Sequence, residues 1–431
     1  MVRNFMNLKN ILLCSLFNQQ GWNNNTVGTY DSRNRHSLSN FTSYSEGSSA
    51  YAVELLHEKW STHHFNDDFS RDGIIAQFKH DISPQDRLYA SILYQESEQG
   101  DVRQITKPGA AARPIRNYTI DANGRATFSG VSTSSREVDG LFGRDPELRI
   151  ENWQEPLVFL SYAREWSPEH TTLALVGHTQ LRSRISDPLG RATMLGGADP
   201  EISYYSEQDF ELQSLELQHI FRNERNQLIL GARYQDGELD DSVETLAAIN
   251  DAIPPSLIPI LVPTAVDSAG TGSTNNDFSR WSAYAYYTRD VTDRLSLIGG
   301  LGLEGIDFAD GLQSTARTTS RKEKELFSPK LGVIWQMHDD WVLRAAASRS
   351  LSGYSIEDQL RLEPSQIGGL VSSYRSLIPT SATGTMAGGT NDVFNINLSG
   401  ALNDRTFTTF EAFHGRFSGD RAFGLFEETI R

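Results

Sequence analysis

The chain has 431 residues, and 39 Lys and Arg against 55 Asp and Glu give it a formal net charge of −16. It has no clustered basic run, and because neutralising phosphates requires such clusters, nucleic acid is excluded as a partner. No apolar stretch reaches the 18 residues of a spanning helix, but strands with one apolar face can also cross a membrane. The single cysteine, Cys14, excludes an internal disulfide and a cysteine-based zinc site.

Residues 1–35 are predicted to form a poorly defined N-terminal segment. A short apolar run at 11–17 follows two basic residues, as in a signal peptide, but no small-residue cleavage site follows it. The residue before Cys14 is leucine, whereas a lipoprotein signal needs a small residue there. We interpret "LKNILLCSLF" at 8–17 as a remnant strand, with a signal peptide as the alternative.

From residue 36 onwards, apolar and polar side chains alternate in pairs of segments joined by short polar turns. In one such pair, Ile74, Ala76 and Phe78 share one face of "RDGIIAQFKHD", and "RLYASILYQESE" repeats the pattern after "ISPQD". Period two with a tight turn predicts a β-hairpin. Seven hairpins are predicted: 37–44 with 49–60, 72–81 with 87–98, 153–166 with 171–184, 207–220 with 227–238, 280–291 with 294–308, 331–337 with 341–351, and 391–402 with 406–417.

The connections between hairpins differ from the turns within them. They are rich in Gly, Ser, Thr, Asp and Pro, and the longest are expected at 99–152, 239–278 and 352–390. Alternation of short turns with long loops is typical of outer-membrane barrels, which have short periplasmic turns and long outer loops. The strands also suit a tilted membrane crossing in length. We therefore predict an all-β, antiparallel up-and-down transmembrane β-barrel of about 14–16 strands over residues 36–431.

Tryptophan placement supports the barrel, because aromatic residues form girdles at both membrane interfaces. Three tryptophans lie next to long loops and three near tight turns: Trp60, Trp153 and Trp281, then Trp166, Trp335 and Trp341. The opposite parity of the strands carries polar residues such as Arg233, Gln235 and Arg344, as expected of a wet lumen.

Three segments resemble TonB-dependent-receptor-like barrels. "FSPKLGVIWQMHDDWVLRAAASRSL" is similar to their penultimate hairpins, and "NDDFSRDGIIAQFKHDISPQDRLYASILYQESEQGD" to earlier ones. "RLEPSQIGGL" at 361–370 resembles a stretch in tetratricopeptide-repeat proteins that carry such a barrel at their C-terminus, except at Ser365 and Gly368. The resemblance implies an outer-membrane transport or receptor barrel, with TonB or a periplasmic repeat domain as partner. No plug, TonB box or helical repeat is recognisable in this sequence.

No constellation of residues predicts catalysis, a metal site or a cofactor. The ten histidines are scattered, so no Ser, His and carboxylate set converges in the sequence, and we expect no enzyme. His63 and His64 near Asp67 and Asp68 offer metal-ligand atoms, but adjacent histidines on an extended chain point to opposite sides.

Two stretches are candidates for facing a ligand. The loop at 249–266 has four prolines, which prevent regular structure, yet it is strongly apolar and must be covered. Its residues Leu257, Ile258, Ile260 and Leu261 either fold into the barrel mouth towards a ligand or pack against neighbouring loops. The carboxylate of Glu363 either constricts the lumen or caps a loop.

These observations predict a transport or receptor barrel in a Gram-negative outer membrane, surrounded by its lipid, that takes a small-molecule or polysaccharide substrate. An export or structural barrel without a plug, working with periplasmic repeats, and a large soluble β protein are the alternatives. With tight turns on the periplasmic side, the strand at 37–44 runs inward, which implies an outward strand before residue 36. We therefore expect an incomplete barrel: a fragment of a longer polypeptide, cut at both ends, that does not close alone.

Overall fold

The computed structural model describes thirteen stretches of the chain, and every structural statement below concerns them: residues 20–31, 35–61, 68–100, 113–120, 126–134, 149–191, 201–248, 270–309, 321–352, 361–371, 388–403, 405–423 and 426–430. In these stretches the regular structure is entirely β-strand. They contain no helix long and apolar enough to cross a membrane.

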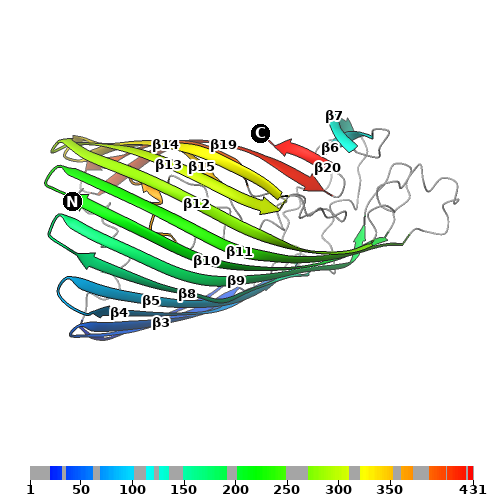
Figure 1. Ribbon diagram of the computed structural model, residues 1–431, viewed down its shortest axis with the longest axis horizontal. Helices are drawn as coiled ribbons and strands as arrows, with labels where there is room; N and C mark the ends of the chain where they lie inside the picture. The colour runs from blue at the N-terminus through cyan, green and yellow to red at the C-terminus, as the bar shows by residue number, and fades with distance from the viewer. Residues whose placement is uncertain are drawn as a thin grey trace.

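One antiparallel sheet forms the wall of the molecule, and each strand pairs with the next strand of the wall (Figure 1). Its strands, in order, are β1 (Gly21–Tyr30), β2 (His36–Glu46), β3 (Ser49–Trp60), β4 (Phe69–Asp81), β5 (Asp86–Gln99), β8 (Arg149–Glu165), β9 (His170–Arg191), β10 (Glu201–Arg222), β11 (Asn226–Ala248), β12 (Gly270–Thr292), β13 (Leu295–Ala309), β14 (Arg321–His338), β15 (Trp341–Leu351), β18 (Thr390–Asn403) and β19 (Thr406–Phe423). This up-and-down order confirms the predicted fold class.

All seven predicted hairpins are present. Leu331 of β14 pairs with Ala347 of β15, and Trp335 pairs with Leu343, so the apolar parity predicted for this hairpin lies on one face. The tight turns are closed locally: in the turn between β4 and β5, the backbone amide of Asp86 donates to Ser83 Oγ at 3.0 Å. Period two and turn chemistry were therefore sufficient to locate these strands.

Strands also occur where the sequence analysis expected loops or no defined structure. β11 and β12 run into the range 239–278, and the hairpin of β6 (Arg113–Ile120) and β7 (Ala126–Ser134) lies within 99–152. β20 (Phe426–Ile430) pairs with both β19 and β7.

The outward strand expected before residue 36 is β1, which pairs with β2 over its whole length. Its sequence GWNNNTVGTY has no apolar parity, so alternation did not reveal it. The stretch proposed for this strand, 8–17, lies outside the described residues. Within the described chain no ladder joins β1 to β19, and the incomplete barrel remains a prediction.

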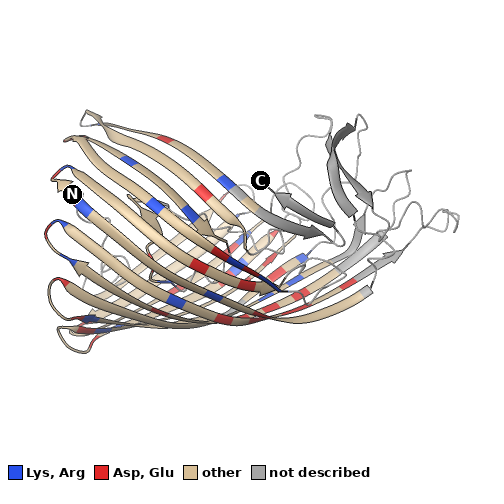
Figure 2. Ribbon diagram, turned by 45° about the horizontal axis from the view of Figure 1, so that its top comes forward, with Lys and Arg blue, Asp and Glu red and all other residues tan. Residues whose placement is uncertain are grey.

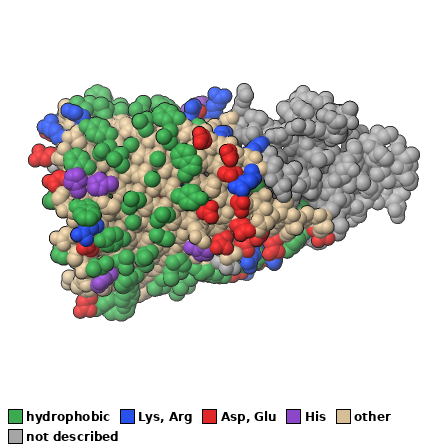
Figure 3. Space-filling model, in the orientation of Figure 1, with side chains coloured by type: hydrophobic (Ala, Val, Ile, Leu, Met, Phe, Trp, Pro, Cys, Tyr) green, Lys and Arg blue, Asp and Glu red, His purple; other side chains and the backbone are tan. Residues whose placement is uncertain are grey.

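The outer face of the wall is a broad apolar surface. Large side chains stand more than half exposed on it, for example Leu217 at 57%, Leu301 at 54% and Leu331 at 65%. Figure 3 shows this surface extending from the tight turns over much of the wall, up to a band of acidic side chains. Figure 2 likewise shows acidic residues on the strands towards the long-loop end of the wall. Soluble monomers rarely expose apolar patches of this extent, whereas lipid covers them in a membrane.

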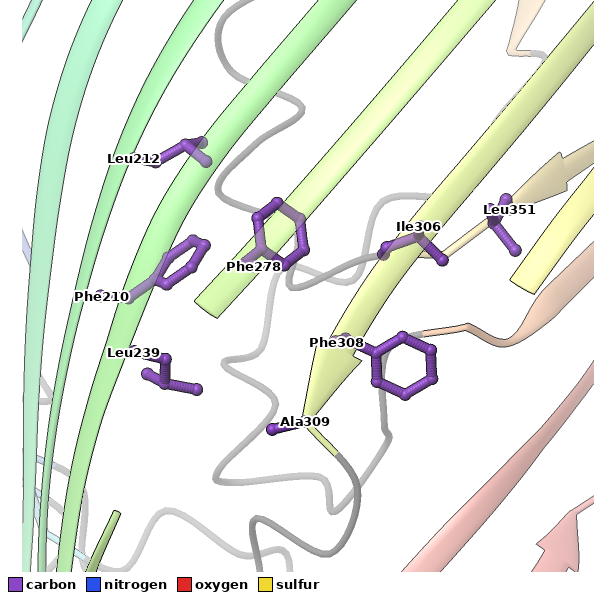
Figure 4. Close-up of a cluster of buried hydrophobic side chains, with 8 residues drawn as sticks. All are labelled: Phe210, Leu212, Leu239, Phe278, Ile306, Phe308, Ala309 and Leu351. Atoms are coloured by element: carbon purple, nitrogen blue, oxygen red, sulfur yellow. The ribbon is translucent and has the colours of Figure 1, made fainter. Parts of the chain in front are cut away.

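The inner face is buried and mixed. Polar residues occupy it as predicted, with Arg233 3% and Gln235 0% exposed. Nearer the long loops, however, it carries an apolar cluster drawn from five strands (Figure 4). The cluster comprises Phe210, Leu212, Leu239, Phe278, Ile306, Phe308, Ala309 and Leu351. The inner face is therefore polar at the predicted positions and also carries apolar side chains that the sequence analysis did not single out.

The two faces predict how an added charge will affect assembly. Leu301→Arg places a charge within the apolar outer surface and should cost roughly 2–4 kcal/mol if it lies near the bilayer midplane. Leu402→Arg, beside the tight turn after β18, should cost about 0–1 kcal/mol because the side chain lies at the rim. Heat-modifiable gel mobility after membrane extraction reports assembly, and equal tolerance of both changes would contradict a lipid-facing surface.

Candidate functional site in the barrel lumen

A short hairpin lies against the inner face of the wall. It is formed by β16 (Gln366–Ile367) and β17 (Leu370–Val371), which pair through Gln366 with Val371 and Ile367 with Leu370. The two residues between the strands are glycines with φ of 62° and 77°. Positive φ at both central positions is what a tight two-residue hairpin turn requires, and glycine adopts it without steric cost. We call residues 361–371 the lumenal hairpin.

The carboxylate of Glu216 on β10 holds the start of the lumenal hairpin. Its two oxygens accept the backbone amides of Leu362, at 2.6 Å, and Glu363, at 3.0 Å. The hydroxyl of Tyr284 on β12 donates to the same carboxylate at 2.6 Å. Gln218 donates its side-chain amide to the carbonyl oxygen of Leu362 at 3.0 Å. Hydrogen bonds to an ionised group are the stronger kind, so this carboxylate is the main anchor.

A second contact joins Glu363 to β12 and β14 of the same wall. Lys330 on β14 places its ammonium 2.8 Å from the carboxylate of Glu363. Tyr286 on β12 donates to that carboxylate at 2.5 Å, and Lys330 donates to Tyr286 at 2.5 Å. The side chains of Lys330 and Glu363 are 6% and 5% exposed. A buried pair of this kind is costly to break, because the remaining charge has no compensation.

Close packing completes the docking. Ile367 is 1% exposed, and a Cβ added to Gly332 on β14 would lie 2.5 Å from its Cγ2 atom. Glycine at 332 is therefore needed for the lumenal hairpin to approach the wall. Leu362, 2% exposed, packs with Leu157 and Leu175 of β8 and β9. The hairpin thus contacts the inner face from β8 to β15.

The lumenal hairpin and the end of β15 lie at different levels of the wall. β15 ends at Leu351 on the long-loop side, where Arg280 donates to the Leu351 carbonyl at 3.0 Å and pairs with Glu304 at 3.1 Å. The hairpin then contacts Gln218 and Lys330, four and eight residues from the tight-turn ends of β10 and β14. Residues 361–371 therefore lie against the inner face at a level nearer the tight turns than the end of β15.

The charged side chains around the lumenal hairpin differ in the partners that they have. Burial raises the pKa of the Glu363 carboxyl, but Lys330, Arg361 and Arg233 outweigh burial and hold its pKa well below the usual range. Arg233, 3% exposed, makes no hydrogen bond within the described chain. The positive charge of Arg233 is one of those that lower the pKa of the Glu363 carboxyl.

The predicted site residues have different outcomes. Glu363 lies in the lumen, where it is held by Lys330 and Tyr286. Leu257, Ile258, Ile260 and Leu261 lie outside the described residues, as do His63, His64 and Asp67. The part of the chain that the structure describes contains no cluster of three or more residues able to hold a metal ion.

Sequence reasoning did not identify the residues of the wall that hold the lumenal hairpin: Glu216, Gln218, Tyr284, Tyr286 and Lys330. All five lie on the inward parity of their strands. A charged residue at an inward position in mid-strand, such as Glu216, was the available signal, because burying a charge requires a partner.

The sequence matches the family model described as "TonB dependent receptor-like, beta-barrel" over residues 15–420. The chain belongs to this family. The match covers nearly the whole chain and supports the membrane barrel over the soluble β protein considered from the sequence. No match is found among curated protein sequences.

Three solved structures of transporters and receptors share the fold. The copper transporter OprC has a TM-score of 0.56 at 11% identity, over 96% of this chain and 57% of the other. The ferripyoverdine receptor of the outer membrane of Pseudomonas aeruginosa gives 0.55 at 11% identity, over 93% and 49%. The ferric citrate transporter FecA gives 0.54 at 14% identity, over 92% and 50%. The chain thus spans about half the length of these structures, and identities this low establish the fold alone.

In this TonB-dependent-receptor-like barrel, removing one charge of the buried pair should release the lumenal hairpin. Lys330→Met removes the cation that contacts the buried Glu363 carboxylate, at a cost of up to about 3–5 kcal/mol, which the more distant Arg361 and Arg233 reduce. Hydrogen exchange at the backbone amides of Leu362 and Glu363, which donate to Glu216, should therefore accelerate.

Two controls accompany this prediction. Adding Glu363→Gln to Lys330→Met removes the unpaired charge and should restore much of the protection of both amides. Arg349→Met breaks an ion pair with Asp392 whose side chains are 46% and 44% exposed, and it should leave that exchange unchanged. Protection that is the same in Lys330→Met and the unaltered protein would contradict the anchoring role of the pair.

Proposed function

We propose that this chain forms the wall of a transport or receptor barrel in a Gram-negative outer membrane and that the lumenal hairpin constricts its passage. The observation that carries the proposal is the docking of residues 361–371 inside the wall by Glu216 and Lys330. A loop that merely covered the barrel mouth would have no need of buried anchors at this depth. Family membership and the apolar outer face support the membrane setting.

The substrate that the proposal implies is a small molecule or a polysaccharide that passes the lumen when the hairpin moves. The similar solved structures include a copper transporter and a ferripyoverdine receptor, by their descriptions. Leu257, Ile258, Ile260 and Leu261, in the loop between β11 and β12, are proposed to contact the ligand at the outer mouth. An apolar loop next to the outer ends of these strands suits that role.

An export barrel that works with periplasmic repeats is the second candidate function. The run Leu362, Glu363, Pro364 and Gln366 carries the resemblance to barrels of tetratricopeptide-repeat proteins, and two of these residues dock the lumenal hairpin. The two functions imply different partners: TonB for uptake and a helical repeat domain for export. Uptake that is lost when TonB is deleted would favour the first, and substrate release that does not depend on TonB would favour the second.

Gly332→Ala tests the constriction. The new methyl group would lie 2.5 Å from Ile367 Cγ2 and 3.1 Å from the Gly368 nitrogen, so it should displace the lumenal hairpin. Overpacking of this kind costs about 1–3 kcal/mol, which raises the undocked population roughly 5- to 150-fold. Currents through single proteins in planar bilayers should increase.

Gly299→Ala is the matched control, because a Cβ at Gly299 on the outer face of β13 meets nothing within 4 Å. Its currents should equal those of the unaltered protein. If amide exchange shows the hairpin undocked in Gly332→Ala while the currents remain those of the control, the lumenal hairpin does not constrict the passage.

A further inference from the structure

The outer face of the wall has an apolar groove of about 630 Å³ across β10 to β13. Its floor consists of small residues, Ala232, Ala283 and Ala285, and leucines rise on both sides of it. The leucines are Leu217 and Leu230 on one side and Leu301 and Leu303 on the other, each between 45% and 57% exposed. We call this feature the alanine groove. Its volume falls in the range of small-molecule binding sites.

Strand register shows why the groove forms. Leu217 pairs with Ala232, which pairs with Ala283, which pairs with Leu303, so two alanines stand between two leucines in one row across the sheet. Side chains at paired positions lie on the same face, and adjacent strands are about 4.8 Å apart. Two short side chains in such a row leave a gap about two strands wide. Along β12, Trp281 and Tyr287 bound the alanines at either end and are 42% and 43% exposed.

The groove becomes polar towards the tight turns. The neighbouring row runs from Leu301 through Ala285 and Leu230 to His219, Thr172 and Arg164. From Ala285 onwards each step of this row lies closer to the tight-turn end of its strand, and Arg164 is the last residue but one of β8. The row therefore begins in the apolar surface and ends at the membrane rim.

The side chains at the polar end form a connected group. Thr172 Oγ1 lies 3.0 Å from His219 Nδ1 and accepts the Trp166 indole N–H at 2.9 Å. His219 Nε2 lies 3.1 Å from His170 Nδ1. The guanidinium of Arg164 lies over the Trp166 ring at 4.5 Å, and Asp86 accepts one of its hydrogen bonds at 3.0 Å. The imidazoles and the Arg164 guanidinium, which has further N–H groups beside the one donated to Asp86, offer donors for a phosphate at the membrane surface.

We propose that the alanine groove binds one phospholipid of the periplasmic leaflet, with an acyl chain on the alanines and the phosphate near His219 and Arg164. Tight turns face the periplasm in outer-membrane barrels, so the polar end lies at the level of that leaflet's head groups. The groove opens onto the lipid phase, so an acyl chain is its natural occupant. The leucine walls then contact the chain on both sides, which a flat barrel surface does not offer.

Filling the groove tests this proposal. The protein and its variants are reconstituted in vesicles of phosphatidylethanolamine and phosphatidylglycerol and extracted into mild detergent, and retained phospholipid is counted by native mass spectrometry. Ala283→Leu with Ala285→Leu should reduce the retained lipid roughly tenfold. Ala347→Leu, at an outward alanine of β15 away from the groove, should retain as much lipid as the unaltered protein.

A second variant keeps the test decisive if the filled groove prevents assembly. His219→Ala leaves the alanine floor intact, and it should retain less phospholipid while showing normal heat-modifiable mobility. Equal retention in the unaltered protein and in every assembled groove or His219 variant overturns the proposal. The proposal is also overturned if the unaltered protein retains no phospholipid. It is overturned as well if protein extracted from outer membranes carries lipopolysaccharide, and filling the groove removes that lipid instead of a phospholipid.

Discussion

The structure depends on one constraint, the period of two along a β-strand that must separate lipid from lumen. Successive side chains point to opposite faces, so a strand that presents leucines to lipid necessarily places every second residue inside. Leu215 and Leu217 are more than half exposed on the outside of β10, and Glu216 between them is completely buried on the inside. The apolar outer positions of a strand therefore determine which of its residues can place a charged side chain on the inner face.

The lumenal hairpin uses the charges that this constraint places inside. Glu216 and Lys330 stand on different strands, and each binds the segment 362–363 through buried contacts. The interior near the tight turns therefore combines these polar contacts with an apolar cluster around Ile367 and Leu370, and the interior near the long loops carries aromatic and aliphatic side chains. Alanines and glycines mark the places where other groups approach: Gly332 on the inside for the lumenal hairpin, and Ala283 on the outside for the proposed lipid.

The sequence predicted the fold where a local pattern expresses this constraint. Alternation and tight-turn residues located all seven hairpins, because both signals lie within a few residues of one another. β1 was missed because Asn23, Asn24 and Asn25 give it no apolar parity, and the outer part of β11 because acidic residues occupy both of its faces there. In the parts of the strands that extend outside the bilayer, alternation of apolar and polar residues is no longer required, so the sequence pattern that predicts a strand is weaker there.

The candidate site could be predicted only in part. The run around Glu363 was predicted to constrict the lumen or to cap a loop; the structure places its carboxylate beside Lys330 on the inner face, and the constriction is our proposal. Its anchors were not predictable, because 146 residues separate Glu216 from Leu362 and no local pattern connects them. Pairing across such a distance is decided by the curvature of the whole wall.

The most direct test of the account is a cross-link between the lumenal hairpin and the wall. In a Cys14→Ser background, Gly332→Cys with Ile367→Cys removes the isoleucine side chain and places a thiol at each position; a Cβ added at Gly332 would lie 2.5 Å from Ile367 Cγ2. We predict a disulfide in the assembled protein, found by mass spectrometry after free thiols are blocked. Gly299→Cys with Ile367→Cys, which places one thiol on the lipid face, should form none. Absence of the first cross-link in assembled protein, or equal cross-linking of both pairs, would contradict a hairpin docked in the lumen.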